Sequence, residues 1–205
     1  MPGDFDQTHE KILSSAKQNF LAHGYERTNL RRICTDACIT TGAFYFHFPD
    51  KEALFSALVE PVVQGSKNMY TASEEENYDL FDKGSLDQLY EISYKSIAGY
   101  INYIYDNFDC FKLLLMCSDG TEYSNFVDDI VTLEENSAEA FLAILKQKKI
   151  KINELQKEDI HLLIHSYYSS IFEVVAHDFT RDRALAHAHI LKTFYNAGWR
   201  ALFNI

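Results

Sequence analysis

The segment from residue 28 to residue 50 constrains the fold most strongly, because it predicts two short helices joined by a tight turn. Thr28 and Asn29 can cap the first of these helices. Thr40 can cap the second, which is expected to run only from about Thr41 to His47. Two short helices joined this closely are typical of a helix-turn-helix.

A longer helix is expected ahead of these two. Thr8 is a capping residue, apolar residues follow it at helical spacing, and Gly24 supplies a stop. The three helices would then pack as a small domain. The apolar residues expected to hold it together are Ile12, Leu13, Ala16, Phe20, Leu21, Leu30, Ile33, Cys34 and Ala37.

An unusually aromatic stretch, "FYFHF", occupies the last of the three helices. Phe44 and Phe48 are four residues apart, so they share one helix face and are expected to enter the core. Tyr45 and His47 are left on or near the other face. The rings are therefore divided between a small core and a presented surface.

Composition favours an all-α chain. The sequence has 205 residues with 47% hydrophobic residues, but only 8 Gly and 3 Pro, which argues against a turn-rich β architecture. No apolar run is long enough to span a bilayer, and the first ten residues do not resemble a signal peptide. A cytoplasmic protein is expected.

The formal net charge of −11 argues against nucleic acid as a partner when it is taken alone. Its distribution weakens that argument. Residues 1–60 hold six Lys or Arg and eight Asp or Glu, so most of the excess negative charge lies in the remainder of the chain. The N-terminal segment could still present a locally basic face.

The N-terminal segment resembles the tetracycline-repressor (TetR) family of bacterial transcription regulators. The resemblance lies in "ILSSAKQNFLAHGYERTNLRRI" and "ACITTGAFYFHFPDKEALFSAL", and it covers about the first quarter of the chain. Cys38 departs from the family pattern, which usually has Gly in this turn, so an adjusted backbone is expected there. The resemblance implies a helix-turn-helix DNA-binding domain at residues 1–51. It also implies a helical ligand-binding and dimerisation domain at residues 52–205, with about nine helices in total.

A recognition helix enters the major groove by its N-terminal end, which suits the small residues found here. Thr41 is placed to reach a base, Gly42 and Ala43 allow close approach, and Arg31 and Arg32 add positive charge. By resemblance, the residues that would mainly hold phosphates are Thr28, Thr40, Tyr45, His47 and Lys51.

The rest of the chain is expected to be helical. Asp50 can cap a fourth helix, which is expected to kink or end near Pro61. A solvated loop is expected around Glu74, Glu75 and Glu76. A capping box at Ser85 and Gln88 would start a buried helix.

Two long apolar helices close the sequence, at about residues 158–178 and 181–203. Two helices from each of two subunits can form a four-helix interface, and the resemblance implies that the family dimerises there. A dimer would also present two recognition helices to successive major grooves.

Aromatic residues of the C-terminal part are candidates for lining a small-molecule site, although each could equally be ordinary core. The resemblance implies an inducer there, and its chemistry would be hydrophobic or cationic. The candidates are Tyr94, Tyr103, Phe111, Met116, Phe126, Phe141, Tyr167 and Phe172.

The expected function is a dimeric transcriptional regulator, a repressor released by a small-molecule ligand. A metal- or redox-responsive regulator is an alternative, using His161 with His165 or Cys34 with Cys38, although no metal or cofactor site is predicted. A helical enzyme is a second alternative, but no nucleotide-binding, nucleophile or metalloprotease motif is present. A helical interaction module that has lost DNA binding is a third.

Overall fold

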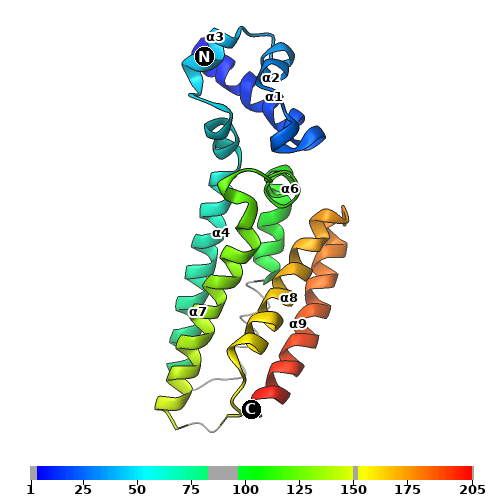
Figure 1. The fold of residues 1–205 in the computed structure, drawn as a ribbon. Helices are drawn as coiled ribbons and strands as arrows, with labels where there is room; N and C mark the ends of the chain where they lie inside the picture. Colours follow the sequence, from blue (N-terminus) through cyan, green and yellow to red (C-terminus); the bar gives the residue numbers. More distant parts are fainter. Residues whose placement is uncertain (1–3, 83–96, 150–151, 205) are drawn as a thin grey trace. The chain divides into compact units, whose positions relative to one another are not determined.

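The computed structural model describes residues 4–82, 97–149 and 152–204, and within these ranges the chain forms helices and no strand (Figure 1). This confirms the all-α class. The chain divides into two compact units. The first comprises Met1–Gly65 with Asn107–Phe126, and the second Ser66–Asp106 with Val127–Ile205.

The first unit is built from helices packed on a common core. It holds α1 (Asp4–Arg27), α2 (Leu30–Asp36), α3 (Thr41–His47), the first half of α4 (Lys51–Asp82), α6 (Phe108–Met116) and the short 3₁₀ helix η1 (Glu122–Asn125). The side chains fully excluded from solvent at its centre include Ile12, Phe20, Ile33, Phe44, Leu54 and Phe55.

Helix α1 begins four residues before the predicted start at Thr8, so that prediction was wrong. Asp6 in the first turn is favoured by the helix dipole, and the Phe5 ring stacks on His47, so the extra turn has contacts of its own. Gly24 interrupts the helix as expected, with a φ of 75° and ψ of 165° that side chains disfavour, but one further turn follows it to Arg27.

Helix α4 is longer than the sequence predicted. It continues through Pro61, so that proline does not end it. Val59, Val62 and Val63 are buried on either side and hold the helix where one backbone hydrogen bond is missing. The backbone at Glu74, Glu75 and Glu76 is also helical, and the predicted loop was wrong, because Glu is a good helix former as well as a solvated residue.

The second unit contains residues 97–106, which are helical, together with α7 (Phe126–Gln147), α8 (Lys157–Ala176) and α9 (Arg181–Phe203). Helices α8 and α9 lie side by side, as the sequence predicted for its last two helices (Figure 1). The Tyr105 hydroxyl donates to the Phe179 carbonyl at 2.6 Å, and Arg181 pairs with Asp106 at 2.6 Å, so the turn between α8 and α9 is fixed to residues 97–106. The predicted capping box at Ser85 and Gln88 lies outside the described residues.

Among the helices that the structure describes, none combines the length and the apolar character needed to cross a bilayer.

Candidate nucleic-acid interface

Helix α3 has the local structure predicted for a recognition helix. The Thr40 hydroxyl oxygen accepts a hydrogen bond from the Ala43 N–H at 3.1 Å, which confirms Thr40 as the N-cap. Phe44 is fully buried and anchors the helix, and Phe48 is 5% exposed just after it. Thr41 at the N-terminal end is exposed.

The turn before α3 explains the departure at Cys38. Its φ is 55°, a left-handed conformation in which Gly is usual. The Ile39 N–H donates to the Cys34 carbonyl at 2.9 Å and the Cys38 N–H to the Thr35 carbonyl at 3.0 Å. This pair of bonds is a Schellman motif, which ends α2 and requires the left-handed residue at this position. The expected backbone adjustment is therefore present.

The start of α2 is capped by Asn29, whose side-chain oxygen accepts from the Arg31 N–H at 2.8 Å. Arg31 and Arg32 are both exposed on this helix. Arg32 lies 4.0 Å from the Asp36 carboxylate, one helical turn away, whereas Arg31 makes no ion pair with another described residue. Arg31 is thus the less neutralised of the two cations.

Thr28 is a buried residue, 4% exposed, and not the cap that the sequence suggested. Its hydroxyl donates to the Gly24 carbonyl at 2.6 Å and contacts the Asn19 carbonyl at 3.1 Å. Both bonds lie within the protein, so the hydroxyl proton is committed to the end of α1. A phosphate contact by Thr28 stays a prediction.

Lys51, the first residue of α4, stabilises the turn between α1 and α2. Its ammonium donates to the Tyr25 carbonyl at 2.8 Å and the Thr28 carbonyl at 3.2 Å, and lies 4.0 Å from the centre of the Tyr25 ring. Burial lowers the pKa of Lys51, and Glu26 opposes that effect. An ammonium has three N–H donors, so one remains for a phosphate.

The remaining predicted DNA contacts lie together on α3. Tyr45 is 55% exposed, with its ring edge-on to Phe44. His47 is half-buried at the helix end, where its ring stacks on Phe5. Sequence reasoning did not select Phe5, His9 or Phe46, although Phe5 and His9 are one helical turn apart.

The predicted ligand-binding residues are divided between the two units. Phe111 and Phe126 are buried edge to face in the first unit, where Met116 is 49% exposed. In the second unit Phe172 is buried, and burial raises the pKa of Tyr167. Tyr103 and Phe141 are half-buried in that unit, and Tyr94 lies outside the described residues.

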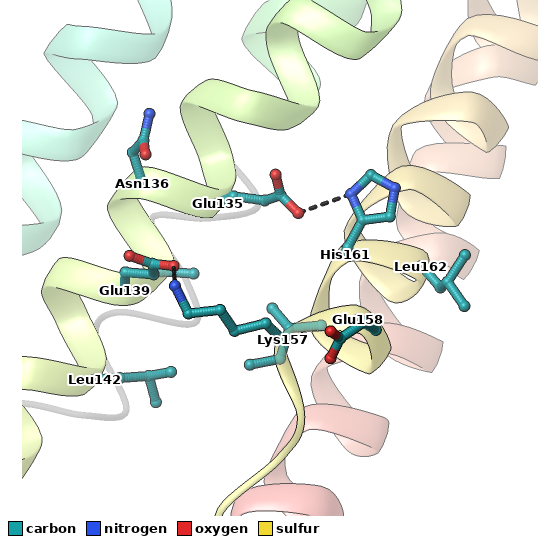
Figure 2. A pocket seen from close by; sticks show the side chains of 10 residues that line it. Glu135, Asn136, Glu139, Leu142, Lys157, Glu158, His161 and Leu162 are labelled. Carbon is teal, nitrogen blue, oxygen red and sulfur yellow. Dashed lines mark hydrogen bonds and ion pairs between the residues drawn. The ribbon is translucent and has the colours of Figure 1, made fainter.

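A pocket of about 430 Å³ lies between α7 and α8, and none of those candidates lines it. Figure 2 shows the side chains that do. His161 Nδ1 lies 2.8 Å from a Glu135 carboxylate oxygen, and the Lys157 ammonium pairs with Glu139 at 2.5 Å, so two cross-helix polar contacts lie in the pocket wall. The lining residues are Glu135, Asn136, Ala138, Glu139, Leu142, Lys157, Glu158, Ile160, His161 and Leu162.

The residues of the metal- and redox-responsive alternatives have other contacts. His161 and His165 have ring centres 6.1 Å apart, and each faces an acid of α7: Glu135 for His161, and Asp128 at 3.6 Å for His165. No cluster of three or more metal-ligating side chains occurs among the residues described. Cys34 is buried and Cys38 exposed, and both are free thiols.

Comparison with known proteins identifies a family match in the N-terminal segment and a similarity of fold that covers most of the chain. Residues 12–58 match the family model "Bacterial regulatory proteins, tetR family". The chain is 42% identical over 53 residues to the HTH-type transcriptional repressor BepR of Brucella suis biovar 1, covering 26% of this chain and 25% of BepR. It is 41% identical over 54 residues to the A-factor receptor protein of Streptomyces griseus, covering 26% of this chain and 20% of that protein.

The aligned part thus spans about a quarter or less of the length of these relatives. A solved structure from Aquifex aeolicus VF5, described as a transcriptional regulator of the TerR/AcrR family, covers 93% of this chain and 98% of its own. Its TM-score is 0.60 at 17% sequence identity, which establishes a shared helical fold.

Proposed function

We propose that the chain is a homodimeric, DNA-binding transcriptional repressor that a small molecule releases from its operator, because residues 12–58 match the tetR family of bacterial regulatory proteins. Residues 1–51 would bind DNA, and residues 52–205 would dimerise and bind the ligand. The protein would act in the cytoplasm, where bacterial DNA is found. Sequence motifs for catalysis are absent, and the named relatives are a repressor and a receptor, so an enzyme is disfavoured.

The observation that carries the proposal is the exposed tip of α3, anchored from below by the buried Phe44. Thr41 would contact a base edge, while Gly42 and the Ala43 methyl group allow close approach to the groove. Thr40, Tyr45, His47 and Lys51 would hold phosphates, and Arg31 and Arg32 would add charge beside them. Thr28 is included in the proposed DNA-binding set because it stabilises the turn between α1 and α2.

The dimer is supported by large apolar side chains that α8 and α9 leave in water. Phe194 is 71% exposed, Leu162 64% and Ile190 55%. Ile190 and Phe194 are one helical turn apart on α9, and contiguous exposed apolar surface of this kind marks protein–protein contacts. A second copy of the same two helices would cover them symmetrically and would supply the second recognition helix that a two-fold operator requires.

Ligand control would follow from preferential binding to one conformation of the dimer. A ligand can shift an equilibrium only by the difference between its affinities for the two states. The proposed lining includes Tyr103, Phe141, Tyr167 and Phe172 of the second unit. The other residues predicted from the sequence are Tyr94, Phe111, Met116 and Phe126, of which the last three belong to the first unit.

The proposal is tested by incubating the purified protein with genomic DNA fragments, sequencing those that it retains, and measuring their affinity by gel shift. We expect enrichment of a near-palindromic site and a steep fall in affinity between about 50 and 200 mM salt, since phosphate contacts release counterions. Thr41→Ala should change the base preference of the selected fragments. Failure to retain any fragment above background would overturn the proposal.

A further inference from the structure

Two histidines meet where the start of α1 passes the end of α3. The ring centres of His9 and His47 are 5.6 Å apart. The Nδ1 atom of each ring is buried and has no hydrogen-bond partner. Two neighbouring rings that each bury a nitrogen without a partner are unusual, because buried polar atoms in proteins are nearly always satisfied.

Aromatic neighbours hold both imidazoles in place. The Phe5 ring stacks on His47 with centres 4.3 Å apart and planes at 29°. His9 stacks on Phe48 at 4.8 Å and 24°. Phe46 meets the His47 ring edge-on at 5.9 Å. Rotation of the His47 ring would break its stack with Phe5.

The unpaired Nδ1 atoms restrict where each ring carries its proton. In a neutral imidazole one nitrogen is a donor and the other an acceptor. A buried N–H without an acceptor is rarer than a buried acceptor without a donor. No N–H···N bond joins the two rings, so Nδ1–H would be unsatisfied in either of them. The favoured neutral form therefore carries its proton on Nε2.

The His47 Nε2 atom is not among the buried atoms without a partner, and no described residue bonds to it. Its N–H can therefore be reached from outside the protein. His47 also lies at the end of the helix that the proposed function assigns to the major groove.

We propose that Phe5 and His9 are positioning residues for His47. They hold its imidazole with Nε2–H directed outward from the end of α3, where it donates to a DNA phosphate. This inference rests on the proposed DNA-binding function. It adds two residues that lie before the segment matched to the family model, residues 12–58.

The positioning is tested without DNA by nitrogen-15 NMR of the histidine side chains at about pH 8, where imidazoles are ordinarily neutral. We expect His47 and His9 to be the Nε2–H tautomers in the full-length protein. Phe5→Leu should move the His47 ring signals toward averaged tautomers, whereas Phe5→Tyr, which keeps the ring, should restore them. A His47 ring protonated on Nδ1, or one unaffected by Phe5→Leu, would overturn the proposal.

The consequence for DNA is tested by titrating the same variants with a duplex recovered from the retained genomic fragments. Phe5→Leu should weaken binding about tenfold, the scale of one hydrogen bond to a charged group, and leave the salt slope unchanged because no cation is lost. Unchanged affinity in Phe5→Leu, or a slope reduced by about one per subunit, would overturn this role. Failure of the wild-type protein to bind any duplex would instead overturn the proposed function, and the NMR result does not depend on it.

Thermal unfolding of each variant separates these effects from loss of folding. Phe5 is 51% exposed and lies outside the core, so Phe5→Leu and Phe5→Tyr should melt close to the wild type. His9→Phe provides a second route, because it keeps a ring against Phe48 but removes the buried nitrogen. Its His47 tautomer should stay Nε2–H, since the variant keeps a ring beside His47 and leaves the stack with Phe5 intact. Averaged His47 tautomers in a folded His9→Phe variant would contradict the importance of that stack.

Discussion

The backbone N–H of Tyr25 donates to the carbonyl of Cys117 at 2.9 Å, joining the end of α1 to the end of α6. Lys17 pairs with Asp109 at 3.3 Å along the same two helices. These contacts attach a segment from beyond residue 106 to the unit that carries α3. The segment thus becomes part of the body from which the proposed recognition helix projects.

The turn after α6 depends on Gly120, which has a φ of 82°. A Cβ atom there would lie 2.8 Å from Glu26 Cγ, but Glu26 is an exposed, flexible side chain that can move aside. We expect Gly120→Ala to lower the free energy of unfolding by about 1–2 kcal/mol, mainly through backbone strain. Urea unfolding measures this. Adding Glu26→Ala should recover less than about 0.5 kcal/mol; full recovery would mean that the clash, not the backbone, sets the cost.

Substitution of Cys38 by Gly is expected to have the opposite effect on the free energy of unfolding. The Cys38 backbone is left-handed, a conformation that is strained for a residue with a Cβ atom, and the thiol is exposed. Cys38→Gly should therefore raise the free energy of unfolding by about 1 kcal/mol. Cys38→Ala serves as the matched control, because it removes the thiol but keeps the strain, and it should leave stability within about 0.5 kcal/mol of the wild type. Equal stabilisation by both variants would assign the effect to the thiol.

The Tyr123 hydroxyl links η1 to α4. It donates to the Glu60 carboxylate at 2.8 Å and lies 2.7 Å from the Ser56 hydroxyl. Burial, followed by the Glu60 contacts, raises the pKa of Tyr123 to about 12. The folded state therefore holds this proton more tightly than the unfolded state, in which the pKa is about 10.

The sign of the pH effect follows from that difference. The contribution of Tyr123 is fully present below about pH 10 and is lost as the pH rises through about 12, to a total of about 2 kcal/mol. Urea unfolding of wild type and Tyr123→Phe at about pH 8, 10 and 11 should show the difference between them shrinking with pH. Other tyrosines titrate in both proteins and cancel in the difference. A constant difference would show that the proton on Tyr123 is not linked to folding.

Local features of the first unit could be predicted from the sequence because they depend on neighbouring residues alone. The Thr40 cap and the cap at Asp50, whose carboxylate accepts from the Ala53 N–H at 2.7 Å, are of this kind. The left-handed backbone at Cys38 was instead expected from the family resemblance. Thr28 was assigned to a cap because its type suits one, but tertiary packing buried it.

Features that depend on distant parts of the chain could not be predicted in this way. Nothing in the local pattern indicates that Phe5 stacks on His47, or that Tyr25 bonds to Cys117. The prediction of a loop at residues 74–76 was wrong for a different reason, because a run of acidic residues does not distinguish a loop from a helix.

The exposed apolar side chains of α8 and α9 predict that a charge placed among them will prevent dimerisation. Phe194→Glu would place a charge where we propose the second copy packs, and should convert the protein to a monomer in light scattering while its helical circular dichroism is kept. Thr193→Glu adds the same charge at the adjacent exposed position and should leave the dimer intact. A dimer that survives Phe194→Glu would place the contact elsewhere.

Substitution of Lys51 can distinguish two roles of its ammonium, which are stabilising the turn between α1 and α2 and binding a phosphate. Its ammonium bonds to Tyr25 and Thr28, so Lys51→Met should lower the free energy of unfolding by about 1–2 kcal/mol. If its third donor also holds a phosphate, the same variant should weaken binding to all duplexes alike and reduce the salt slope by about one per subunit. Thr28→Val removes the neighbouring hydroxyl without removing a charge, and should reduce stability while leaving the slope unchanged. A Lys51→Met variant with lower stability but an unaltered slope would restrict Lys51 to bracing the turn between α1 and α2.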